Sequence, residues 1–194
     1  MSCTGILLAA GRGRRFDSTG THNKLLQQLP NGEIVVLQAA RRLVQVLPDT
    51  LVVVSSKERE LLALLQQAGL RTAVCPDATA GIGDSLAHAI GLTSTASGWV
   101  IALADMPYVQ PATIAALHYA LCAGADIAAP VMLGRRGNPV GFGGRHRAAL
   151  LRLRGDQGAR ALLDTCPVTS VEVDDSGIFM DIDTPDDLLT EPTL

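Results

Sequence analysis

Residues 4–16 read "TGILLAAGRGRRF", an apolar run that passes directly into two glycines and three arginines. The first half is short and apolar, as in a buried β-strand. Gly11 and Gly13 permit the backbone conformations of a tight turn. Backbone N–H groups in such a turn wrap phosphate oxygens, and arginine adds bidentate contacts to them. The stretch therefore predicts a strand followed by a phosphate-binding loop, with a solvated basic turn as the alternative. The three arginines are Arg12, Arg14 and Arg15.

Two common phosphate-binding fingerprints do not account for this loop. The dinucleotide fingerprint G-x-G-x-x-G requires a glycine at position 16, where Phe16 stands. The Walker A pattern G-x-x-x-x-G-K-[ST] occurs nowhere in the chain. A P-loop kinase and a nicotinamide dehydrogenase are therefore not expected. Lys24, downstream of the arginines, is left as a further cation that this loop can bring to a phosphate.

The composition of the chain predicts one domain that covers residues 1–194. Hydrophobic residues make up 47% of the chain and charged residues 18%, which is enough apolar material for a sizeable core. Aromatic residues are only 3%, so binding of nucleic acid by base stacking is not expected. No apolar run approaches the roughly 20 residues that a membrane span needs. The expected partners are therefore small molecules or proteins.

The four cysteines are scattered along the chain without a CxxC pair, so neither a zinc site nor a disulfide framework is expected. They are Cys3, Cys75, Cys122 and Cys166. The N-terminal segment lacks the basic region of a secretory leader and is interpreted as a first strand. A reducing, cytoplasmic location follows from these two features. His88 and His118 fall within predicted helices and are expected on helix surfaces.

Strand-like and helix-like segments alternate along the chain, which is typical of an α/β protein with a mostly parallel sheet and helices on both faces. The strand-like segments are 4–10, 50–56, 71–75, 98–105, 126–132, 138–142, 168–174 and 177–182. The helix-like segments are 35–47, 55–69, 84–92, 110–124, 145–153 and 158–165. Ser55 and Glu58 have the spacing of a capping box at the start of their helix. Ligands of such sheets bind beyond the carboxyl ends of the strands. The loops there are 10–24, 76–85, 104–108 and 181–187.

Five segments resemble, in order, the motifs of the MobA-like nucleotidyltransferases, and more narrowly those of the MocA-like molybdenum cofactor cytidylyltransferases. They are LLAAGRGRRF with NKLLQQL (7–29), ALADMPYV (102–109), GRRGNPVGF (134–142), GDQGAR (155–160) and DIDTPDDL (181–188). Each match alone is weak, but five in order over nearly the whole chain are specific. The resemblance implies a three-layer Rossmann-like nucleotidyltransferase fold, similar to nucleotide-diphospho-sugar transferases, with a mostly parallel sheet. The chain departs from the motifs at two positions, where Asp17 replaces a glycine and Asn138 replaces a histidine. In addition, segment 17–22 makes the loop before Lys24 longer.

The activity implied by the resemblance is Mg²⁺-dependent transfer of CMP from CTP to the phosphate of a molybdopterin-type cofactor, with release of diphosphate. Arg15, Lys24 and Asp105 would be the catalytic residues. Mn²⁺ is an alternative to Mg²⁺, with Asp105 and Asp181 as its ligands and Asp183 as the less favoured candidate. A molybdoenzyme or its maturation chaperone is the implied protein partner. The residues implied to contact the nucleotide are Leu8, Ala9, Ala10, Gly11, Arg12, Gly13, Lys24, Gly81, Gly83, Ser85 and Asp105.

Several readings stay open at this point. In the resemblance, Ala-Ala-Gly accompanies cytidylyl transfer, whereas Ala-Gly-Gly accompanies guanylyl transfer, so Ala10 favours CTP over GTP. A sugar 1-phosphate or an isoprenoid-precursor phosphate is an alternative acceptor. A non-catalytic nucleotide-binding accessory protein is a further alternative. Gly81, Gly83 and Ser85 are equally well explained as a loop that leads into a helix. Pro107–Tyr108 and residues 135–142 are expected to line the acceptor side.

Overall fold

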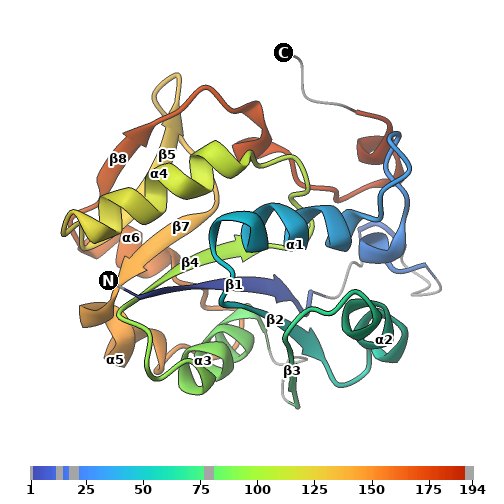
Figure 1. The fold of residues 1–194 in the computed structure, drawn as a ribbon, viewed down its shortest axis with the longest axis horizontal. Helices are drawn as coiled ribbons and strands as arrows, with labels where there is room; N and C mark the ends of the chain where they lie inside the picture. Colours follow the sequence, from blue (N-terminus) through green and yellow to red (C-terminus); the bar gives the residue numbers. More distant parts are fainter. Residues whose placement is uncertain (1, 12–14, 18–21, 77–80, 191–194) are drawn as a thin grey trace.

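A mostly parallel sheet runs through the middle of the fold (Figure 1). The structure is a computed structural model that describes residues 2–11, 15–17, 22–76 and 81–190. Within these residues the sheet has eight strands in the order β3-β2-β1-β4-β7-β5-β6, and β8 pairs with β5. The strands are β1 (Cys3–Ala9), β2 (Thr50–Ser55), β3 (Thr72–Cys75), β4 (Gly98–Leu103), β5 (Ile127–Met132), β6 (Arg135–Arg136), β7 (Val140–Gly143) and β8 (Thr169–Glu172).

The parallel part of the sheet is formed by β3, β2, β1 and β4, and β8 is parallel to β5. The exceptions are β7, which lies antiparallel between β4 and β5, and β6, which is antiparallel to β5. β1 and β2 are buried along their whole length. Strands covered on both faces have no polar side to present, which explains why their sequences are apolar runs without alternation.

Helices cover both faces of the sheet and give the fold its three layers (Figure 1). The α-helices are α1 (Val35–Val46), α2 (Arg59–Gln67), α3 (Ile82–Leu92), α4 (Pro111–Cys122), α5 (Arg147–Leu150) and α6 (Arg160–Thr165). Short 3₁₀ helices are η1 (Lys24–Leu26), η3 (Gly144–His146), η4 (Ser176–Phe179) and η5 (Pro185–Leu189). The predicted fold class is confirmed.

Each face of the sheet has its own hydrophobic core. On one face, α1, α2 and α4 contribute buried leucines such as Leu43, Leu61 and Leu117. On the other, α3 and α5 contribute Leu86 and Leu150, and partly buried leucines of α6 pack against them. Each fully buried leucine side chain stabilises the fold by roughly 2 kcal/mol of transfer free energy. Within the described part of the chain, no helix combines the length and apolar character needed to cross a membrane.

Two local predictions are wrong. Ser55 does not cap a helix: it is the last residue of β2, and α2 starts at Arg59 without a side-chain cap. The carboxylate of Glu58 instead accepts a hydrogen bond from Asn23 Nδ2 at 2.7 Å. Segment 177–182 is not a strand, because Ser176–Phe179 forms η4, capped by the Asp175 side chain that accepts from Gly177 N. A contact between distant segments replaces the expected cap at Glu58, and a local cap outweighs the apolar pattern at η4.

Candidate active site

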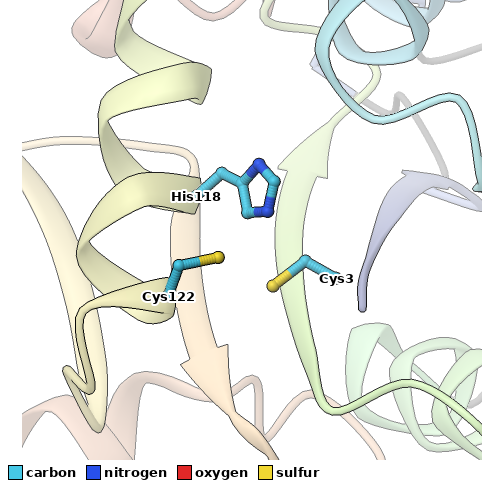
Figure 2. A group of neighbouring side chains, drawn as sticks. All are labelled: Cys3, His118 and Cys122. Carbon is cyan, nitrogen blue, oxygen red and sulfur yellow. The ribbon is translucent and has the colours of Figure 1, made fainter. Parts of the chain in front are cut away.

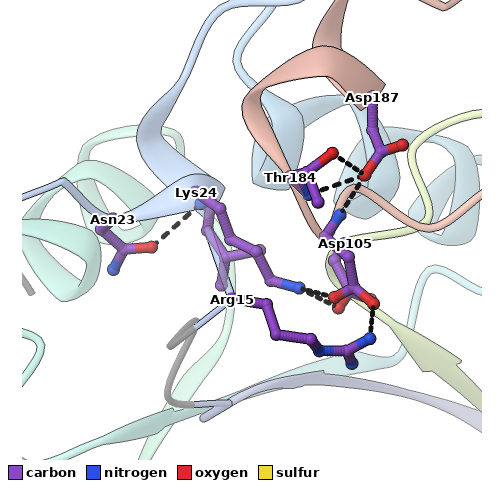
Figure 3. Close-up of polar contacts among 8 residues, drawn as sticks. Arg15, Asn23, Lys24, Asp105, Thr184 and Asp187 are labelled. Carbon is purple, nitrogen blue, oxygen red and sulfur yellow. Dashed lines mark hydrogen bonds and ion pairs between the residues drawn. The ribbon is translucent and has the colours of Figure 1, made fainter. Parts of the chain in front are cut away.

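A buried lysine links two carboxylates beyond the carboxyl ends of β1 and β4. Lys24 Nζ lies 2.7 Å from Asp105 Oδ2 and 2.9 Å from Asp183 Oδ1 (Figure 3). The guanidinium of Arg15 lies 2.6 Å from the other oxygen of Asp183. Only 9% of the Lys24 side chain is exposed, against 79% for Arg15. Three loops that are far apart in sequence thus meet in one cluster of charges, hereafter the Lys24 cluster: Arg15, Lys24, Asp105 and Asp183.

The position of Lys24 is set by the short helix η1. Asn23 caps this helix, since its Oδ1 accepts from Leu25 N at 2.9 Å (Figure 3). The amide group of Asn23 also donates to Glu58 at the start of α2. Leu25 is buried in the core under α1. Lys24 therefore extends from a turn that is fixed on both sides, and its ammonium group needs little reordering to meet a ligand.

Backbone contacts hold Asp105 and Asp183 close together. Ile182 N donates to Asp105 O at 2.8 Å, and the Ile182 side chain is buried, which sets the backbone of Asp183 beside β4. Asp187 Oδ2 accepts from the N–H groups of Asp183 and Thr184 and from the Thr184 hydroxyl (Figure 3). This capping box stabilises the start of η5 and orders the loop that carries Asp183.

The charges in the Lys24 cluster stabilise one another. Burial disfavours the ammonium form of Lys24, but attraction and hydrogen bonds to Asp105 and Asp183 outweigh it and raise the pKa of Lys24. Burial likewise disfavours the carboxylate of Asp183, yet its contacts with Lys24 and Arg15 lower the pKa of Asp183. At neutral pH these two groups are therefore a charged pair.

Asp181 lies at the edge of the Lys24 cluster and is exposed. Its pKa is raised by burial of the carboxyl group, by a hydrogen bond with Asp183 and by the negative charges of Asp183 and Asp105. Asp105 and Asp183 both face Lys24, and their negative charges reach Asp181. Carboxylate oxygens are the ligands that Mg²⁺ and Mn²⁺ prefer in proteins. The residues present therefore fit Mg²⁺ or Mn²⁺. Residues 177–182 do not form the predicted strand, but Asp181 and Asp183 both lie near Lys24.

The residues that open the phosphate loop are only partly within the described structure. Leu8 and Ala9 are buried in β1, Ala10 is half-buried, and Gly11 is exposed. Arg12, Gly13 and Arg14 lie outside the described residues, so their predicted role stays a prediction. Phe16 packs against the core, and Asp17 accepts from His22 N at 2.8 Å.

Gly81 and Gly83 have a packing role that the sequence pattern did not show. A Cβ on Gly81 would lie 2.1 Å from the Gly155 backbone, and one on Gly83 would lie 2.5 Å from Gln157 O. Gly83 N donates to Gly155 O, and Asp84 accepts from Gly155 N. The start of α3 thus sits directly on the GDQGAR segment. Ser85 is buried, and its hydroxyl lies 3.5 Å from Gly81 O.

A cavity of about 520 Å³ opens on the α3 and α6 face of the sheet. Leu8 and Leu103, near the carboxyl ends of β1 and β4, form part of its wall. Asn138 and the two arginines Arg136 and Arg160 also line it. Five residues of segment 135–142 thus line a cavity, and their expected place on the acceptor side stays a prediction. Tyr108 is not on this wall: it is buried in the opposite core.

A match to a protein family over most of the chain defines the class of this protein. The family model of the MobA-like NTP transferase domain matches residues 5–172, so the chain belongs to this family and is a nucleotidyltransferase. The Lys24 cluster thus lies in a domain that handles nucleoside triphosphates. A search of curated protein sequences found no match.

The chain is also similar to solved structures. The manganese complex of Rv0371c from Mycobacterium tuberculosis H37Rv is 27% identical, with a TM-score of 0.79 over 96% of each chain. A Methanothermobacter nucleotidyl transferase, Mth528, has a TM-score of 0.79 at 21% identity, over 96% of this chain and 94% of that one. The molybdopterin-guanine dinucleotide biosynthesis protein A of Archaeoglobus fulgidus has a TM-score of 0.69 at 20% identity, over 95% and 94%. The last two share the fold with this chain.

Proposed function

We propose that this nucleotidyltransferase transfers CMP from CTP to the phosphate of a molybdopterin-type cofactor and releases diphosphate. The observation that carries the proposal is the Lys24 cluster, in which a buried ammonium and a guanidinium converge with carboxylates at the ligand-binding edge of the sheet. The motif resemblance, in which Ala9 and Ala10 accompany cytidylyl transfer, favours CTP.

The two cations of the cluster support a triphosphate ligand. Arg15 and Lys24 supply two positive charges, and Asp105, Asp181 and Asp183 supply three negative ones. Both cations form ion pairs with the carboxylates of Asp105 and Asp183. Phosphate oxygens compete for the same cations, and arginine offers a bidentate contact to them. Arg15 and Lys24 would then hold the triphosphate.

A divalent cation completes this balance. Asp105 and Asp181 would hold it, and Asp183 is the alternative ligand. When bound, a cation of this kind neutralises phosphate charge and orients the phosphoryl oxygens. Rv0371c, which is similar to this chain, was crystallised as a manganese complex. Mg²⁺ is proposed as the ion used here, with Mn²⁺ as a substitute.

The reaction needs positioning more than acid or base catalysis. An acceptor phosphate is already anionic at neutral pH, so one of its oxygens can attack the α-phosphorus without a general base. A bond forms between that oxygen and the α-phosphorus, while the bond from the α-phosphorus to the bridging oxygen breaks. The electron pair leaves with diphosphate. Lys24, held in place by Asn23 and η1, is well situated to offset charge that develops at the α-phosphoryl group.

The remaining contacts divide between nucleotide and acceptor. Leu8, Ala9, Ala10 and Gly11 would pass beside the base and phosphates, and Gly81, Gly83 and Ser85 would approach the base or ribose. The 520 Å³ cavity is of a size for a small organic acceptor. Arg136 and Arg160 on its wall would bind the acceptor's phosphate.

The acceptor and nucleotide are tested by one panel. Diphosphate release is measured with Mg²⁺ and each of CTP, GTP, ATP and UTP, with and without molybdopterin-type cofactor, a sugar 1-phosphate or an isoprenoid-precursor phosphate. Release with CTP that requires the molybdopterin-type cofactor supports the proposal. Release with GTP, or with another acceptor, overturns the assigned substrates but keeps the reaction class. CTP binding without release from any pair supports the non-catalytic accessory protein instead.

A further inference from the structure

A cluster of soft metal ligands lies at the opposite end of the sheet from the Lys24 cluster. Cys3 is the first residue of β1, and His118 and Cys122 belong to the second half of α4. One donor atom from each of the three residues lies within 4.8 Å of the other two. Figure 2 shows the two helix side chains directed toward the sulfur of Cys3. We propose that these three residues bind one Zn²⁺ ion per chain, with solvent as the fourth ligand.

The helix geometry brings two of the ligands to one place. His118 and Cys122 are four residues apart, and residues at this spacing lie on the same face of an α-helix. The imidazole and the thiol therefore approach one point in space without any distortion of α4. Many protein zinc sites take two of their ligands from one helix at a similar spacing.

The third ligand is supplied by the tertiary fold. Cys3 is 8% exposed, and its backbone pairs with Gly98 of β4, so its side chain is fixed in the sheet. The Cys3 and Cys122 sulfur atoms lie within 4.8 Å of each other. Burial and the neighbouring Cys122 thiol raise the pKa of Cys3 to about 11. A metal ion would displace the proton of this thiol on binding.

The dimensions of the cluster fit zinc. Bond lengths of about 2.3 Å to sulfur and 2.0–2.1 Å to nitrogen place the donors of a tetrahedral site about 3.6–3.8 Å apart. Donor atoms that lie within 4.8 Å of one another need movements of at most about 1 Å to reach these separations. Cys122 is exposed, so water can reach the fourth position.

The charge and type of the ligands select the metal. Two thiolates balance the charge of one divalent ion, and the imidazole is neutral, so the loaded site carries no net charge. Thiolates and imidazole bind Zn²⁺ well and are poor ligands for Mg²⁺, which prefers oxygen. The site is therefore chemically distinct from the carboxylates of the Lys24 cluster. An ion here would tie the second half of α4 to the start of β1 and stabilise the fold.

The test uses the full chain, reduced and stripped of metal, in buffer with excess Mg²⁺ to occupy the carboxylates. Zn²⁺ is titrated against a competing chelator, and Co²⁺ is added separately to report sulfur ligation through its thiolate charge-transfer absorption. We expect one Zn²⁺ per chain, a thiolate–Co²⁺ band, and a higher thermal midpoint that a chelator reverses. Loss of an outer-shell partner already weakens metal binding about 10–100-fold, so Cys122→Ser and His118→Ala should weaken it at least a hundredfold.

Matched controls keep the outcome clear. Cys166→Ser and His88→Ala change a cysteine and a helical histidine outside the cluster and should bind Zn²⁺ like the wild type. The proposal is overturned if the reduced protein shows no thiolate–Co²⁺ band, or if Cys122→Ser binds Zn²⁺ with unchanged affinity. It is also overturned if Cys3 and Cys122 form a disulfide in air while the reduced protein takes up no metal. None of these readouts depends on nucleotide transfer.

Discussion

The two ends of β1 carry opposite kinds of chemistry. Beyond its carboxyl end, roughly 20 Å from its first residue, lie the cations and carboxylates of the Lys24 cluster. At its amino end lie the two thiols and the imidazole of Cys3, Cys122 and His118. The first group suits hard partners such as phosphate and Mg²⁺, and the second suits a soft ion such as Zn²⁺. One sheet thus separates a proposed reaction site from a proposed structural metal site.

The difference also lies in how each group is assembled. The Lys24 cluster is built from loops that follow strands, which is where α/β sheets bind ligands. The cysteine–histidine group is built from elements of regular structure, one strand and one helix. Loops can exchange partners when a ligand arrives, whereas a strand and a helix hold their side chains in place. Catalysis is therefore expected at the carboxyl end and stabilisation at the amino end.

A large loss of turnover is expected at Lys24. Lys24→Ala removes the buried ammonium group that faces the phosphates, and loss of such a transition-state contact costs about 3 kcal/mol, or roughly a hundredfold in turnover. Turnover is measured as diphosphate release at saturating CTP and acceptor. A thermal melt of the same sample shows whether the variant is folded.

Arg71→Ala is the matched control for the loss of Lys24. Arg71 also makes a close ion pair, 2.6 Å from Asp49, but both side chains are about half exposed. Exposed pairs contribute less than about 1 kcal/mol, so turnover and stability should change little. If folded Lys24→Ala retains the turnover of Arg71→Ala, the Lys24 cluster is not the reaction site.

The two aspartates of the DIDTP segment should separate into two roles. Asp181→Asn removes a proposed metal ligand, so the Mg²⁺ concentration for half-maximal turnover should rise about tenfold or more. Asp183→Asn removes the partner of Lys24 and Arg15, so turnover should fall even at saturating Mg²⁺. Titrations of turnover against Mg²⁺ distinguish the two. The reverse pattern would make Asp183 the metal ligand.

A smaller effect is expected at the support of the nucleotide site. Gly83→Ala places a Cβ 2.5 Å from Gln157 O and should lower stability by about 1–3 kcal/mol. For a chain of this size this corresponds to about 2–4 °C per kcal/mol. Gly91→Ala, in the same helix, meets only Leu151 at 3.9 Å and should be neutral or stabilising by up to about 1 kcal/mol. Equal melting temperatures for the two variants would contradict the close packing of α3 on the GDQGAR segment.

The smallest effect is a pH dependence at the amino end of the sheet. His146 is buried beside the start of β4, and burial lowers its pKa below the ordinary value of 6.5. The unfolded chain then binds this proton more readily than the folded one, so stability is complete above about pH 6.5 and falls as the pH decreases below it. Thermal melts from pH 8 to pH 5 should show a decrease of a few degrees that is smaller in His146→Phe. An identical decrease in the variant would assign the effect to other groups.

The sequence predicted the fold and most of the Lys24 cluster, because both depend on local patterns. Apolar runs, helix periodicity and motifs placed Lys24 and Asp105 at strand ends, where the topology brings them together. The pairing of Asp183 with Lys24 and Arg15 is not predictable from the motif, because it depends on contacts between segments far apart in sequence. A hydrogen bond from Ile182 to Asp105, far away in sequence, fixes this segment instead.

The group of Cys3, His118 and Cys122 was not predictable from sequence spacing. A CxxC pair indicates a metal site because its two ligands are close together in sequence. Cys3, by contrast, lies far from α4 in sequence, and only the folded sheet brings them together. The spacing of His118 and Cys122 was the one available signal. The packing of Gly83 was not predictable from sequence for the same reason. Gly83 packs against Gln157 and donates a hydrogen bond from its N–H to Gly155 O, and both residues are more than seventy positions away in sequence.

The central claim is that the Lys24 cluster performs nucleotidyl transfer, and Asp105 tests it most directly. Diphosphate release is measured for the wild type and for Asp105→Asn, with CTP, Mg²⁺ and molybdopterin-type cofactor. The variant keeps the shape of the side chain and loses its charge. We predict acceptor-dependent release by the wild type and none by a variant that melts at a similar temperature. Equal release by both proteins would contradict the account.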